Sequence, residues 1–135
     1  MIRPIGADDR PAVETLRDHL EYTDRKLLDA AIDGPFRGRI AIESGTIVGY
    51  AIGFPGRTTI LSELVVAPAY RRTGHGRALV DAMASAADGD EIAVTTPTEN
   101  EAARRFYTAL GFKRDERVRE FYADGADALR LVRRE

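Results

Sequence analysis

The chain of 135 residues contains no cysteine and no tryptophan, and it has only two histidines. The absence of cysteine excludes disulfides, thiolate metal ligands and a cysteine nucleophile. His19 and His75 alone are too few for a histidine-rich metal centre, so we expect no bound metal. No apolar run approaches the 18 or so residues that a membrane-spanning helix needs. We therefore expect a protein that has no membrane partner.

The sequence also lacks a large excess of charge of either sign. Lysine and arginine number 20 and aspartate and glutamate 22, which gives a formal net charge of −2. A dedicated nucleic-acid binder would usually be strongly basic, so we expect no nucleic-acid partner. The first residues, Met1 to Asp9, turn acidic where a signal peptide would need an apolar core. The sequence is thus typical of a cytoplasmic protein, and its length fits one domain spanning residues 1–135.

The pattern of apolar residues and turn signals predicts an α+β (mixed α/β) domain. We expect a central, mostly antiparallel twisted sheet of about six or seven strands, flanked by about four helices. Short turns at Ser44-Gly45 and Pro55-Gly56 make the strands on either side antiparallel neighbours. The predicted strands span 2–5, 40–42, 47–52, 58–66, 91–96, 112–122 and 126–133, and the predicted helices follow Asp8, Thr23, Gly76 and Thr98.

The most informative segment joins the strand 58–66 to the next helix. It carries two glycines in the pattern Arg71-x-x-Gly74-x-Gly76, placed in a loop directly before the helix. Glycines let the backbone approach a ligand closely, and the free N–H groups of a first helical turn bind anions such as phosphate. The flanking arginines would add positive charge. Taken alone, the pattern is equally consistent with a loop that only caps a helix.

A second segment combines a helix start with a helix stop. Thr98 and Glu101 have the spacing of a capping box, in which each side chain satisfies the other's backbone N–H. An apolar stripe containing Ala103, Phe106 and Leu110 follows, and Gly111 has the position of a C-terminal cap. We expect a helix that begins at Thr98 and ends before Gly111.

Together these two segments resemble the GNAT superfamily of N-acetyltransferases. Leu64-Val65-Val66-Ala67-Pro68 followed by Arg71-x-x-Gly74-x-Gly76 is similar to its acetyl-coenzyme A motif, and Asn100 to Phe112 is similar to its downstream motif. The motifs occur in the family's order with a strand between them, and the expected elements match along the whole chain. The resemblance implies a GNAT-like fold and acetyl-coenzyme A as co-substrate.

The resemblance also implies which residues hold the cofactor. In the family, backbone groups of the strand bind the pantetheine arm as an added strand would, which requires the fourth and fifth strands to part. Amides of the loop hold the pyrophosphate, and Asn100 contacts the arm. We expect His75, between the two glycines, to be solvated rather than a base. The implied cofactor-binding residues are Leu64, Val65, Val66, Arg71, Arg72, Thr73, Gly74, His75, Gly76, Arg77 and Asn100.

By the same resemblance, Tyr107 matches the family's usual general acid. A phenol near the departing sulfur can donate a hydrogen bond or a proton to it. Tyr107 follows Asn100 by about two helical turns, so both can lie on one helix face. The alternative is an aromatic side chain that packs beside Phe106 in the core.

Glu63 is the candidate base that removes a proton from the amine, either directly or through a water molecule. Alternation along the strand would place Glu63 and Val65 on one face. The alternative is a carboxylate paired with a nearby arginine. Some relatives that acetylate protein N-termini carry a glutamate where this chain has Thr95, which counts against assigning the chain to that subgroup.

We therefore expect transfer of an acetyl group from acetyl-coenzyme A to a primary amine on a small molecule or peptide. Without cysteine there is no acetyl-cysteine intermediate, so attack is direct within a ternary complex. The alternatives are a non-catalytic coenzyme A-sensing or interaction domain of the same fold, and transfer of a longer acyl group. The acceptor is expected near 20–38 and Phe121, and an exposed edge strand would allow a homodimer. Acidic residues there would suit a cationic amine or basic peptide: Glu21, Asp24, Asp29 and Asp33.

Overall fold

The computed structural model describes residues 1–20 and 25–134. Within them, seven strands form one mixed sheet in the order β1-β2-β3-β4-β5-β7-β6, and four α-helices flank it, as predicted. The elements are β1 (Ile2–Pro4), α1 (Arg10–Arg17), α2 (Arg25–Asp33), β2 (Arg37–Glu43), β3 (Thr46–Phe54), β4 (Thr58–Val66), α3 (His75–Ser85), β5 (Glu91–Pro97), α4 (Glu101–Ala109), β6 (Lys113–Val118) and β7 (Ala128–Arg134).

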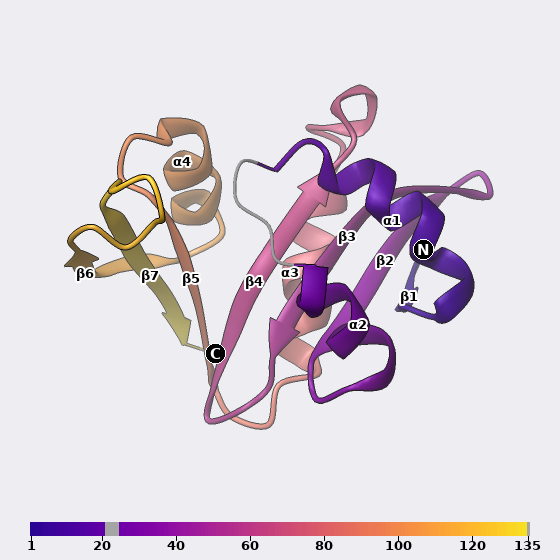
Figure 1. Cartoon of the computed structure of the whole chain (residues 1–135), viewed down its shortest axis with the longest axis horizontal. Helices are drawn as coiled ribbons and strands as arrows, with labels where there is room; N and C mark the ends of the chain where they lie inside the picture. The colour runs from indigo at the N-terminus through magenta and orange to yellow at the C-terminus, as the bar shows by residue number, and fades with distance from the viewer. Residues whose placement is uncertain (21–24, 135) are drawn as a thin grey trace.

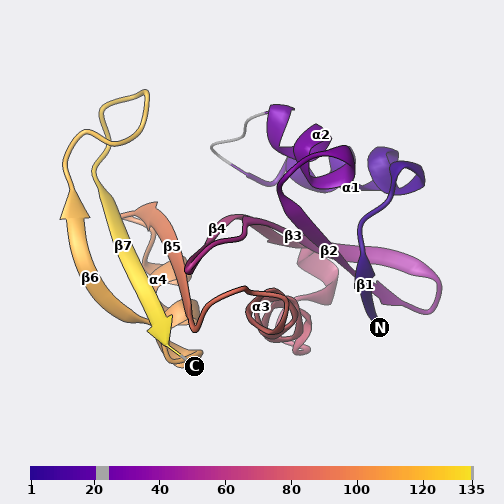
Figure 2. The same ribbon diagram turned by 90° about the horizontal axis from the view of Figure 1, so that it is seen from below.

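The helices lie on both faces of the sheet. Helices α1 and α2 cover one face, and α3 and α4 cover the other (Figure 2). Each face has its own apolar core: Leu79, Met83 and Leu110 belong to the α3/α4 core, and Val13 and Leu28 belong to the α1/α2 core. Because β3 is covered on both faces, its residues from Val48 to Gly53 are all buried, as in a central strand with no solvated side.

Strands β4 and β5 start as a parallel pair and then separate. Their register runs from Thr58 opposite Glu91 to Leu61 opposite Val94 and goes no further, although β4 continues to Val66. Figure 1 shows the two strands spreading apart toward the end where α4 lies. From Ser62 onward, β4 therefore has only β3 as a strand neighbour among the described residues. Its other edge is free to bind an extended ligand.

A β-bulge in β4 decides which side chains face the site. The register with β3 jumps from Ile52 opposite Glu63 to Gly53 opposite Leu61, so Ser62 has no partner. The extra residue moves the side chains that follow it to the other face. Leu61 accordingly lies in the α3/α4 core, whereas Val65 lies in the α1/α2 core.

The structure corrects two helix starts. Asn100, not Thr98, is the N-cap of α4, because the Thr98 N–H donates to the Asp127 carbonyl and holds Thr98 beside β7. The predicted capping box is therefore wrong. Helix α3 begins at His75, so Gly76 lies in its first turn rather than in the loop.

Other boundaries differ by a few residues. The predicted strand 112–122 ends at Val118, and Glu120 has a φ of +51° in the connection to β7. The C-terminal cap of α4 is confirmed: Gly111 has a φ of +94°, and the N–H groups of Gly111 and Phe112 donate to Thr108 and Tyr107, as in a Schellman motif. The predicted cap Thr23 lies outside the described residues.

Candidate functional site

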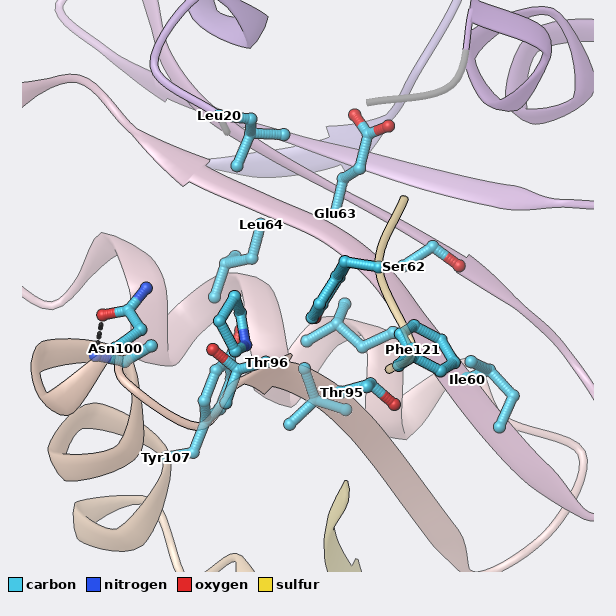
Figure 3. Close-up of a pocket in the computed structure, with 15 residues that line it drawn as sticks. Leu20, Ile60, Ser62, Glu63, Leu64, Thr95, Thr96, Asn100, Tyr107 and Phe121 are labelled. Atoms are coloured by element: carbon cyan, nitrogen blue, oxygen red, sulfur yellow. Dashed lines mark hydrogen bonds between the residues drawn. The ribbon is translucent and has the colours of Figure 1, made fainter. Parts of the chain in front are cut away.

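The gap between the parted strands holds a pocket of about 360 Å³ (Figure 3). Its walls come from β4, β5 and α4, and from the segments that follow α1 and β6. Residues distant in sequence therefore meet at one place. The lining residues are Leu20, Ile60, Leu61, Ser62, Glu63, Leu64, Val94, Thr95, Thr96, Pro97, Asn100, Ala103, Tyr107, Phe121 and Tyr122.

The N-terminus of α3 presents unpaired backbone amides. Gly74 is its N-cap with a φ of +91°, and Arg72 has a φ of +63°. In the described chain, the backbone N–H groups from Arg72 to Arg77 donate to no acceptor. Six free amides and the positive end of an 11-residue helix favour a bound anion such as a phosphate.

The loop before α3 is fixed by side chains. Arg71 Nε donates to the Val66 carbonyl at 2.9 Å, and Thr73 Oγ1 donates to the Tyr70 carbonyl at 2.7 Å. Arg71 thus joins the loop to the end of β4. Because these bonds are made within the chain, the free amides keep their direction without a ligand, and little ordering is needed on binding.

Gly76 and His75 have roles that the sequence did not indicate. A Cβ on Gly76 would lie 2.8 Å from Cζ of Phe106, so a glycine here lets α4 pack against the first turn of α3. His75 is not solvated as expected: its side chain is 14% exposed, and Nε2 lies 3.3 Å from Oε1 of Glu43. Both residues support the position of the loop.

Tyr107 lines the pocket and is also packed in the core. Its ring makes edge contacts with Phe106 and Phe112, with centroids 5.1 and 5.2 Å apart. Figure 3 shows the side chain reaching from α4 toward the space between the strands. Burial, with a smaller effect of Tyr122, raises the pKa of the Tyr107 phenol well above its usual range. The phenol therefore stays protonated at neutral pH and can donate a hydrogen bond.

The two polar atoms of the Asn100 side chain have different surroundings. Its Oδ1 accepts the Ala103 N–H at 3.0 Å, which caps α4 (dashed line in Figure 3). The same residue lines the pocket, at the end opposite to Phe121. Since only Oδ1 is used by the cap, the amide Nδ2 is available as a donor to a ligand.

Glu63 belongs to a buried polar cluster. Arg17 Nε donates to Oε1 at 3.2 Å and Nη2 to Oε2 at 3.0 Å, while Tyr50 Oη donates to Oε1 at 2.7 Å. In Figure 3 the carboxylate points toward the α1 side of the sheet, away from Leu64. Burial and the charge of Glu63 raise the pKa of Tyr50, so this phenol remains a donor. The carboxylate is thus held by three hydrogen bonds beside the pocket.

Sequence reasoning missed several of these residues. Arg17 lies 46 residues from Glu63, and neither Arg17 nor Tyr50 carries a local signal of its contact with it. The predicted acceptor region is represented in the pocket by Leu20 and Phe121. Of the acidic residues expected there, Asp29 pairs with Arg10 at 2.8 Å, and Glu21 and Asp24 lie outside the described residues.

No group of three or more histidine, cysteine, aspartate or glutamate side chains in the described chain is arranged to hold a metal ion. Among the helices at 1–20 and 25–134, none has the length and apolar character to cross a membrane.

The fold and site define an open α+β domain with a pocket between two parted parallel strands and a row of free amides at a helix N-terminus. Residues 5–112 match the model of the Acetyltransferase (GNAT) family. The chain belongs to this family. The match covers both segments singled out in the sequence.

Individual relatives are similar at moderate identity. The chain is 30% identical to a mycothiol acetyltransferase of Clavibacter michiganensis over 146 residues, which cover 93% of this chain and 48% of the relative. It is 40% identical to human N-alpha-acetyltransferase 30 over 78 residues, 56% of this chain and 22% of the relative. The chain thus spans less than half the length of these relatives. The solved structure of Ard1 from Thermoplasma volcanium is 26% identical with a TM-score of 0.86, covering 99% of this chain and 96% of that one.

Proposed function

We propose that this domain transfers an acetyl group from acetyl-coenzyme A to a primary amine by direct attack in a ternary complex. The observation that carries the proposal is the parting of β4 and β5, which brings a free strand edge, a buried phenol and a carboxylate to one pocket. Membership of the family supports acetyl-coenzyme A as the donor.

The residues present fit this co-substrate. The amides from Arg72 to Arg77 would hold its pyrophosphate, and Arg77 would add positive charge. The edge of β4 around Leu64, Val65 and Val66 that has no second strand neighbour would bind the pantetheine arm, since an extended chain with amide groups can continue a sheet. The Val66 carbonyl is already used by Arg71, so the other backbone groups of this edge would make the contacts. Asn100 Nδ2 would donate to the same arm. Acetyl-coenzyme A supplies an activated thioester carbonyl, and the protein supplies its position.

In the proposed reaction an N–C bond forms, and a C–S bond and one N–H bond of the amine break. The lone pair of the neutral amine attacks the thioester carbonyl carbon, the C–S bond breaks, and the sulfur takes its electrons as thiolate. Tyr107 donates a hydrogen bond to that sulfur. A thiol has a pKa of about 8.5 and an unperturbed phenol about 10, so full transfer of the Tyr107 proton is uphill. The hydrogen bond therefore stabilises the thiolate, and solvent protonates it on release.

Glu63 is proposed to receive the amine proton through a water molecule. It is the one carboxylate among the described residues that line the pocket. Its Oε1 accepts two hydrogen bonds, whereas Oε2 accepts one, from Arg17, and so has a lone pair left for water. Arg17 and Tyr50 fix the carboxylate, which favours a well-ordered proton path.

The test is release of free thiol from acetyl-coenzyme A in the presence of a panel of primary amines. We expect amine-dependent thiol release and an acetylated product. The product should be heavier than the amine by about 42 mass units, because an acetyl group replaces one hydrogen. Coenzyme A binding without turnover of any amine would instead favour a non-catalytic sensing or interaction domain. A parallel series with longer acyl donors tests the alternative that a longer group is transferred past Leu64.

A further inference from the structure

The end of the pocket away from Asn100 carries two exposed apolar residues beside the neutral hydroxyl groups of Ser62 and Thr95. Phe121 and Ile60 lie at this end (Figure 3), and these residues are 53% and 39% exposed. Leu20, from the segment after α1, lines the same pocket. Single exposed apolar residues are ordinary, but side chains from three distant segments that converge at one pocket indicate a binding surface.

The described residues that line this end of the pocket offer little charge to an acceptor. Among the described lining residues, none is lysine or arginine, and Glu63 is the one carboxylate. Glu63 already accepts bonds from Arg17 and Tyr50, so it has no full charge to offer a second ammonium group. A charged substituent beside Phe121 would lose its water without gaining a partner, which is unfavourable.

Ile60 and Phe121, here called the apolar wall, therefore select the group that lies next to the reacting amine. We infer that the acceptor is a primary amine whose neighbouring substituent is large and apolar, and that Ile60 and Phe121 determine this preference. The inference rests on the proposed function and names its substrate class. It is an alternative to the cationic amine or basic peptide expected from the acidic composition of residues 20–38, and the experiment below distinguishes the two.

Two sources of such an amine exist, a small hydrophobic amine and a peptide that begins with a large apolar residue. The experiment measures kcat/KM by thiol release for phenylethylamine, spermidine, and matched peptides that begin with leucine, alanine, lysine or aspartate. A methylene in an apolar pocket typically changes kcat/KM about tenfold or more. We expect the leucine peptide or phenylethylamine to exceed the alanine, lysine and aspartate peptides and spermidine at least tenfold. A preference for phenylethylamine would identify the acceptor as a small hydrophobic amine, and a preference for the leucine peptide would identify it as a peptide.

Variants test whether this wall is responsible. Ile60→Thr keeps a β-branched side chain in the strand, and Phe121→Ala removes the ring from the loop. Both should bring the ratio of leucine-peptide to alanine-peptide kcat/KM toward one. Phe54→Ala is the matched control, because Phe54 is 43% exposed but packs on Phe36 and does not line the pocket. It should leave the ratio unchanged.

The outcomes distinguish failure of this inference from failure of the proposed function. Amine-dependent thiol release with equal or better use of spermidine or the lysine peptide would overturn the inference and leave the proposed function standing. An unchanged selectivity ratio in both wall variants would also overturn it. No thiol release with any amine would overturn the proposed function, and the inference with it.

Discussion

Buried polar residues connect the structure of this protein to its proposed chemistry. Tyr107 packs between Phe106 and Phe112 and still lines the pocket, so the two interpretations of it that the sequence left open are compatible. The same is true of Glu63, which is paired with Arg17 and borders the pocket. For substitutions at these positions, both stability and activity must therefore be measured.

The first prediction concerns the phenol. Tyr107→Phe should lower kcat at least tenfold and change the affinity for coenzyme A less than twofold, because it removes one hydrogen bond to the sulfur and keeps the packed ring. Thiol-release kinetics and calorimetry measure the two quantities. Equal kcat in the two proteins would remove Tyr107 from the mechanism.

A pH dependence follows from the same phenol. Tyr107 acts as a donor only while protonated, and its raised pKa moves loss of the proton to more alkaline pH than for an ordinary tyrosine. We expect kcat to show no decline assignable to Tyr107 between about pH 8 and pH 10, the usual tyrosine value. A decline in this range that Tyr107→Phe abolishes would contradict the assigned environment.

The third prediction separates the two roles of Glu63. Arg17→Met should cost about 3–5 kcal/mol of unfolding free energy, since it leaves a buried carboxylate without its ion-pair partner. Adding Glu63→Leu should restore much of that loss, because the pair is then replaced by apolar groups. Urea denaturation measures both. Additive losses in the double variant would show that the two side chains are not coupled.

The same pair of variants tests the proton path. If Glu63 receives the amine proton, the double variant should be stable and yet have a kcat at least tenfold below the wild-type value. Wild-type kcat in the folded double variant would assign Glu63 a structural role alone.

Among the elements, some boundaries follow from local signals in the sequence, and the start of α4 does not. Strand 58–66 and the turn at Ser44-Gly45 were predictable, since an apolar run and a glycine signal lie within a few neighbouring residues. The cap of α4 was not. Thr98 and Asn100 are both good N-cap residues, and the hydrogen bond from Thr98 to Asp127, far along the chain, decides between them.

Non-local contacts also explain what else the sequence did not show. The bulge at Ser62 arises from the register of β4 on β3, and it directs Glu63 toward Arg17. Ile60 and Phe121 line one pocket only because the fold brings β4 and the loop after β6 together. The family motifs supplied the proposed cofactor side of the site, whereas the proposed acceptor side depends on segments without a local pattern.

The fourth prediction tests the proposed anion site as an element. A side chain at Gly74 would meet nothing within 4 Å, and asparagine and aspartate tolerate the positive φ of this position best. Gly74→Asn and Gly74→Asp therefore form a matched pair that differs in charge. We expect the aspartate variant to bind coenzyme A at least tenfold more weakly than the asparagine variant, as measured by calorimetry. Equal affinities would contradict phosphate binding at this loop.

Gly76 is a less direct test of the same site. A side chain there would press on Phe106, so Gly76→Asp should disturb the packing of α4 as well as add charge. Comparison with Gly76→Ala isolates the packing effect. The Gly74 pair avoids this complication.

At the scale of the whole molecule, the proposed function has donor and acceptor enter one pocket from opposite ends. Asn100 would lie at the donor end and Phe121 at the acceptor end (Figure 3). Because the chain has no cysteine, no acetyl-cysteine can form between two half-reactions. Under the proposed function, both substrates must therefore occupy the site at once.

This arrangement predicts the kinetic pattern. Initial velocities measured while acetyl-coenzyme A and the amine are varied should give intersecting lines in double-reciprocal plots, as a ternary complex requires. Parallel lines would indicate a covalent acetyl-enzyme and a ping-pong mechanism.

The most direct test of the central claim is amide hydrogen exchange with and without acetyl-coenzyme A. If the amides at the start of α3 hold the pyrophosphate and the free edge of β4 holds the pantetheine arm, exchange should slow at residues 72–77 and 62–66. Exchange along β6, at the far edge of the sheet, should not change. Binding that leaves exchange at 72–77 and 62–66 unaltered would contradict the account.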